Sequence, residues 1–141
     1  MYNIKKNITI DAPADKIFTA LTTSEEIIKY FPLKHVSSRW QVGEEVLYHG
    51  EAGGAEFTDF GIIEVLDKPI KYGYRYWSDN HGTTRTAENY LSITYVLSEH
   101  GKGTMVEVTQ SNIQTKALYD LMQGQVWDYL LSSLKSYIEK Q

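Results

Sequence analysis

The stretch from residue 116 to residue 141, KALYDLMQGQVWDYLLSSLKSYIEKQ, decides the fold, because it is the longest helical pattern in the chain. At about 100° per residue, its apolar side chains divide between two faces. One narrow face holds Trp127, Leu131, Leu134 and Ile138. A second face, rotated away from the first, holds Leu118, Met122, Val126 and Tyr129. Gly124 lies near the change of face.

Two interpretations of this helix remain open. In the first, the C-terminal half is an anchor docked against a sheet and the first helix, while the N-terminal half roofs a cavity. Gly124, which costs roughly 1 kcal/mol relative to alanine inside a helix, would then let the roof bend independently. In the second, the helix simply curves over a twisted sheet.

The rest of the chain reads as a strand, two short helices and a run of strands. Residues 2–10 alternate apolar and polar side chains, which is typical of a strand. Residues 13–23 and 23–31 have the patterns of short helices. Strands punctuated by Gly and Pro then follow through residue 110, with a long polar loop at 78–89. Short links favour an antiparallel sheet, and only the terminal helix is large enough to cover one face of it. We therefore predict an α+β fold in a single domain over residues 1–141.

Composition excludes several classes of function. The chain carries a net charge of −4 with dispersed basic residues, so a nucleic-acid partner is not expected. It has no cysteine, which removes disulfides, thiol catalysis and cysteine-based metal sites. We find no signal peptide and no membrane span, and we expect a cytoplasmic protein. Tyr is frequent, at 11 residues, and suits apolar surfaces that need a hydrogen-bonding tip.

Five segments carry a resemblance to a known family. They are ITIDAPADKIFTALTTSEEIIKYF (8–31), SRWQVGEE (38–45), GIIEVLDKPIKYGYRY (61–76), GKGTMVEVTQ (101–110) and VWDYLLSSLKSYIE (126–139). In order and spacing they resemble the START-like (SRPBCC, helix-grip) superfamily, in the branch related to the activator of heat shock protein 90 ATPase. Val126 is a departure, because the family usually has glycine before this tryptophan.

The resemblance implies a helix-grip fold, in which a curved antiparallel sheet wraps around the long C-terminal helix and two short helices follow the first strand. It also implies a cavity between sheet and helix that binds small apolar or amphipathic molecules. Some relatives catalyse reactions, some carry ligands, and one branch stimulates a chaperone. Fold alone does not choose among these roles.

Strand parity supplies the candidate ligand-binding residues. Alternate residues of a strand share a face, and the faces rich in tyrosine would suit a cavity with polar tips. The predicted lining is Tyr72, Tyr74, Tyr76, Ile93, Tyr95, Val108, Gln110, Leu118, Met122, Val126 and Tyr129. The alternative is that the tyrosines face outward and pack across strands at the surface.

No catalytic residue, cofactor or metal site is predicted. The four histidines lack metal-ligand spacing, and His81 and His100 are expected to be solvated in loops. The glycine-rich stretch GEAGGAEF lacks the lysine of a phosphate loop. The predicted lining contains no carboxylate or histidine for acid–base catalysis. Asp59 and Glu64 stay open, because both faces of their strand carry apolar residues.

Three functions follow as hypotheses. The first is a noncatalytic protein that binds a small amphipathic ligand. The second is a polyketide cyclase or aromatase, in which Tyr72, Tyr74, Gln110 and Tyr129 orient enolates and a titratable group with a shifted pKa lies in the pocket. The third is stimulation of a chaperone ATPase, for which the sequence shows no exposed patch.

Overall fold

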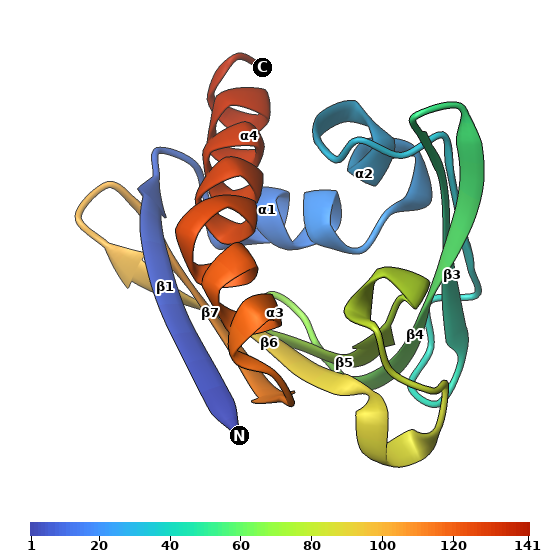
Figure 1. Cartoon of the computed structure of the whole chain (residues 1–141). Coiled ribbons are helices and arrows are strands. Elements are labelled where there is room, and N and C mark those ends of the chain that lie inside the picture. Colours follow the sequence, from blue (N-terminus) through green and yellow to red (C-terminus); the bar gives the residue numbers. More distant parts are fainter.

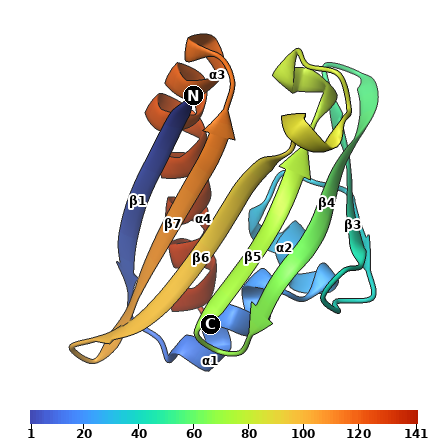
Figure 2. The ribbon, with the colours of Figure 1, turned by 90° about the horizontal axis from the view of Figure 1, so that it is seen from below.

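One curved antiparallel sheet organises the molecule, and the computed structural model describes residues 1–141. Its seven strands lie in the order β1-β7-β6-β5-β4-β3-β2. Figure 1 shows the sheet curving around the terminal helix, with α1 and α2 closing one end. Figure 2 shows the same sheet from below, where the neighbouring strands run side by side from β1 to β3. The strands are β1 (Tyr2–Ile10), β2 (His35–Ser38), β3 (Glu45–Ala52), β4 (Ala55–Asp67), β5 (Lys71–Trp77), β6 (Leu91–His100) and β7 (Gly103–Ile113). The predicted α+β helix-grip fold is confirmed.

The helices occupy one face and one end of this sheet. The short ones are α1 (Ala14–Leu21) and α2 (Ser24–Tyr30), where the sequence predicts them. The chain is helical again from Lys116 to Glu139, in three consecutive parts: α3 (Lys116–Leu121), a π-helical turn η3 (Met122–Val126) and α4 (Trp127–Glu139). No helix is both long and apolar enough to cross a membrane.

A β-bulge resolves the ambiguous parity of β4. Ile63 pairs with Tyr74, but Val65 rather than Glu64 pairs with Gly73, so the register shifts by one residue. Before the shift, the odd-numbered residues Asp59, Gly61 and Ile63 face the core. After it, the inward position passes to Leu66, and Glu64 is left exposed. One extra residue in a strand moves the following side chains to the other face, which is why both faces looked apolar in the sequence.

The predicted polar loop at 78–89 contains two short 3-10 helices, η1 (Asp79–His81) and η2 (Ala87–Asn89). Figure 2 places this segment at the same end of the molecule as α3. The Trp77 indole N–H donates to Thr83 Oγ1 at 3.1 Å, and the Arg85 guanidinium lies 3.6 Å from the Phe60 ring centroid. These contacts hold the segment against the middle of β4 and the end of β5.

The π turn explains the apparent change of face in the terminal helix. The buried residues Met122 and Trp127 are separated by five positions, one more than an α-helical repeat accommodates. A π turn takes up one additional residue, so both halves present a single buried stripe. That stripe consists of Leu118, Met122, Trp127, Leu131, Leu134 and Ile138. The prediction of two separate apolar faces is therefore wrong in form: Tyr129 is 56% exposed and lies outside the stripe.

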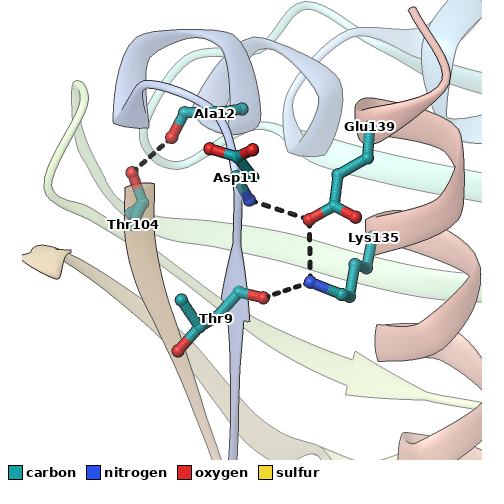
Figure 3. Close-up of polar contacts among 6 residues, drawn as sticks. All are labelled: Thr9, Asp11, Ala12, Thr104, Lys135 and Glu139. Atoms are coloured by element: carbon teal, nitrogen blue, oxygen red, sulfur yellow. Dashed lines mark hydrogen bonds and ion pairs between the residues drawn. The ribbon is translucent and has the colours of Figure 1, made fainter. Parts of the chain in front are cut away.

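The C-terminal half of the helix is fixed to β1 by polar contacts (Figure 3). The Lys135 ammonium donates to the Thr9 carbonyl at 2.6 Å and to Glu139 Oε2 at 2.7 Å. Glu139 Oε2 also accepts the Asp11 backbone N–H at 2.8 Å. Together with the buried Trp127 and Ile138, these bonds make this half a docked element, as the anchor interpretation expects.

A candidate ligand cavity

A cavity of about 310 Å³ lies between the terminal helix and the sheet. Its wall comes from α3, η3 and the start of α4 on one side, and from β3 to β6 and η1 on the other. Figure 1 shows α3 and the start of α4 on the inner side of the curved sheet that contains β4, β5 and β6. Phe31 and Pro32, at the end of α2, complete the wall. The volume is at the lower end of the range typical of small-molecule sites.

Seven of the eleven predicted ligand-binding residues line this cavity. The sheet contributes Tyr74, Tyr76 and Ile93, and the terminal helix contributes Leu118, Met122, Val126 and Tyr129. The structure therefore brings the helix face and part of the tyrosine face together around one space. Whether these residues bind a ligand stays a prediction.

The other four predicted residues lie elsewhere. Tyr72 and Tyr95 line a smaller space of about 30 Å³, which is large enough to hold one water molecule. Val108 and Gln110 are fully buried and line neither space. Gln110 Oε1 instead accepts the Trp127 indole N–H at 2.7 Å, so the amide holds Trp127, which itself lines the larger cavity.

The tyrosines of the sheet face inward, and the alternative with tyrosines at the surface is wrong. Tyr72, Tyr74 and Tyr95 are each less than 10% exposed, and the Tyr72 and Tyr74 rings stack at 4.9 Å between centroids. Burial raises the pKa of all three phenols above the ordinary value, because the charged phenolate loses its hydration. Gly61 lies beside the rings of Tyr48 and Tyr74, and a larger residue there would crowd them, because its Cβ atom would lie 3.3 Å from the Tyr48 ring.

A polar cluster forms one corner of the cavity, and the sequence did not predict it. Asp59 of β4 is 7% exposed and lines the cavity. Its Oδ2 accepts a hydrogen bond from the Tyr76 hydroxyl of β5. Asp59 and Tyr76 sit diagonally across the strand pair, because Tyr76 is paired with Gly61, and a diagonal pair is within reach of a long side chain. Burial, followed by the charge and hydrogen bond of Asp59, raises the pKa of Tyr76.

His81 joins this corner from η1, contrary to the expectation of a solvated loop residue. It lines the cavity, and its ring lies 5.6 Å from the Tyr76 ring between centroids. His81 Nδ1 accepts the Ser78 backbone N–H at 3.4 Å, and the Ser78 side chain accepts the Asn80 N–H at 3.2 Å. Desolvation lowers the pKa of His81, while the Asp59 charge opposes that shift. The neutral imidazole is therefore the form favoured at neutral pH.

These residues do not form a metal site. The structure contains no group of three or more His, Cys, Asp or Glu side chains placed to hold a metal ion.

Comparison with known families agrees with this architecture. Residues 11–139 match the family described as "Activator of Hsp90 ATPase homolog 1-like protein". The chain belongs to this family. The match covers α1, α2, every strand from β2 to β7 and the terminal helix, so it includes every residue around the cavity. No functionally curated protein matches the chain.

Solved structures extend the likeness. ChR145 from Cytophaga hutchinsonii is 28% identical with a TM-score of 0.83, and the alignment covers 99% of this chain and 95% of that one. The Aha1 dimer from Colwellia psychrerythraea is 23% identical with a TM-score of 0.79, covering 99% and 97%. CalU16 from Micromonospora echinospora is 20% identical with a TM-score of 0.72, covering 96% and 75%. The last two support the fold alone.

Proposed function

We propose that the chain is a binding protein for a small amphipathic molecule held between the sheet and the terminal helix, with no catalysis assigned. The observation that carries the proposal is the cavity itself, in which 12 of 17 lining residues are hydrophobic and the polar groups gather in one corner. Such a division matches a molecule with an apolar body and one polar end.

The construction of the cavity supports the proposal physically. A closed core would fill this volume, because protein interiors are packed almost without voids. Here two large apolar side chains at its edge remain partly in water: Leu121 is 48% exposed and Tyr129 is 56% exposed. A ligand that covered Met122 and Ile93 would contact apolar surface at both walls.

Displacement of a fluorescent apolar probe by alcohols, isoprenoids, polyketides and fatty acids tests the proposal, with native mass spectrometry to count bound molecules. Ile93→Trp places a larger side chain inside the cavity and should abolish binding. Val96→Trp is the matched control, because Val96 is on the same strand, β6, but 37% exposed on the other face. Met122→Trp blocks the cavity from the helix side and is a second test if Ile93→Trp folds poorly. Unchanged binding in both cavity variants would refute the proposal.

The second candidate, a cyclase or aromatase-like enzyme, is favoured by one observation. His81 is a titratable group with a lowered pKa at the cavity wall, and neutral imidazole is a common general base. The residues that would assist it differ from those predicted. Gln110 is bonded to Trp127, whereas the Tyr76 ring lies 5.6 Å from the His81 ring and the Asp59 charge acts on His81. Cyclisation of a linear polyketone that is lost in His81→Gln, with ligand affinity retained, would favour this candidate.

Stimulation of a chaperone ATPase stays a prediction from the family resemblance, and an ATPase assay with the added chain tests it.

A further inference from the structure

We propose that the polar corner of the cavity selects amphipathic molecules whose head group donates a hydrogen bond and carries no negative charge, so that alcohols and amines bind in preference to fatty acids. The inference rests on the binding function proposed above and specifies the chemistry of its ligand.

The first observation is an unpartnered acceptor. Asp59 Oδ1 is buried and has no hydrogen-bond partner, whereas Oδ2 accepts from Tyr76. A buried carboxylate oxygen without a donor costs free energy, and buried polar groups in native proteins are normally paired. A ligand O–H or N–H at this corner would supply the missing donor. Asp59 shares the inward face of β4 with Gly61 and Ile63, which precede the bulge.

Three donors of the corner are already directed to other acceptors. The Tyr76 hydroxyl already donates to Asp59 Oδ2. The Ser78 backbone N–H is directed to His81 Nδ1, and the Asn80 N–H is directed to Ser78 Oγ. Among the buried side-chain polar atoms of this corner, Asp59 Oδ1 is the one without a hydrogen-bond partner.

The charge of the corner decides against an anionic head group. None of the 17 lining residues is lysine or arginine, and Asp59 is a carboxylate among mostly apolar neighbours. A second carboxylate brought beside it would be repelled in a medium of low dielectric constant, with no cation to offset the loss of its hydration. A neutral hydroxyl avoids the repulsion, and a protonated amine is attracted.

A series of ligands with the same tail isolates this effect. Binding of decanol, decylamine and decanoate at neutral pH is measured by displacement of the fluorescent probe and by native mass spectrometry. We expect decanoate to bind at least about ten-fold more weakly than the other two, which corresponds to about 1.4 kcal/mol.

Variants assign the selection to Asp59. Asp59→Asn removes the charge and lets an amide N–H turn toward the ligand, so the difference between decanol and decanoate should shrink to less than about three-fold. Glu64→Gln removes a carboxylate from the same strand at an exposed position and should leave the difference unchanged, which controls for long-range charge. Tyr76→Phe frees the second carboxylate oxygen and should preserve or widen the difference, which tests the inference independently of how well Asp59→Asn folds.

The outcomes separate this inference from the function on which it rests. Equal binding of the three ligands overturns the inference and leaves the binding function standing. Selection that persists in Asp59→Asn, or that disappears in Glu64→Gln, also overturns it. Failure of the probe and of every amphiphile to bind overturns both.

Discussion

Trp127 joins the helix, the sheet and the cavity in one side chain. It is 2% exposed, its indole N–H donates to Gln110, and its ring meets the edge of Tyr95 at 6.1 Å between centroids. Deleting so large a buried ring removes packing on every side and leaves Gln110 without its donor.

We expect Trp127→Ala to lower the free energy of unfolding by about 3–5 kcal/mol, measured by urea denaturation. Trp127→Phe keeps most of the ring volume but loses the hydrogen bond, so its cost should be smaller. A loss below about 1 kcal/mol in the alanine variant would show that the tryptophan is not a core residue.

Glu139 makes the stability of the folded protein depend on pH in the acid range. The Asp11 backbone N–H, followed by the Lys135 ammonium, lowers the pKa of this carboxyl. The stabilisation is present above the ordinary carboxyl pKa and is lost as pH falls through the lower pKa of the folded state. Unfolding of wild type and Glu139→Gln should therefore differ at neutral pH and converge in acid. A difference that does not change with pH would contradict this assignment.

At the scale of the element, the sequence predicts most of the strands and helices but not their irregularities. Period-two alternation and Gly or Pro breaks predicted the meander, because these patterns come from backbone geometry. The bulge at Glu64 and the π turn at Met122–Val126 each insert one residue, and hydrophobic periodicity has no separate signal for an insertion. Because of the bulge, the sequence could not predict whether Asp59 faces inward. Because of the π turn, the terminal helix was predicted to have two apolar faces.

His81 was missed for a different reason. A polar loop predicts solvation, but η1 folds back over the end of β5 and buries part of the ring. The stretch SDNHG did contain a usable signal, since serine and aspartate before a glycine are typical of a capped turn. What such a turn packs against depends on contacts distant in the sequence.

Gly124 tests whether the π turn acts as a hinge. A Cβ atom there would meet nothing within 4 Å, so Gly124→Ala should stabilise the protein by up to about 1 kcal/mol. If the turn is a hinge, the same variant should slow probe uptake measured by stopped-flow fluorescence. Gln125→Ala, at an exposed position in the same turn, is the matched control. Stabilisation with unchanged uptake would disprove the hinge.

At the scale of the whole molecule, the buried tyrosines make the stability of the core depend on pH in the alkaline range. Burial raises the pKa of Tyr30, Tyr48, Tyr72, Tyr74 and Tyr76. A phenol whose pKa is raised by folding contributes stability that is complete below the unfolded pKa of about 10. This stability is lost as the pH rises toward the pKa of the folded state.

Spectrophotometric titration of the phenols should therefore show two groups of tyrosines. Tyrosines at the surface should ionise reversibly, while those in the core should ionise only together with loss of near-ultraviolet circular dichroism. The same titration in denaturant is the control, and all 11 tyrosines should then ionise together. A single reversible step in the folded protein would contradict the inward assignment.

The bonds that hold α4 to β1 and the π turn that precedes it have a consequence for amide hydrogen exchange. Exchange from Trp127–Glu139 should require global unfolding, because this half is packed in the core and its end is hydrogen-bonded to Thr9 and Asp11. Exchange from Lys116–Val126 should proceed through smaller local openings, since its hydrogen bonds are interrupted by the π turn. The terminal helix would then behave as two cooperative units, and a bound ligand would slow exchange in the first unit far more than in the second.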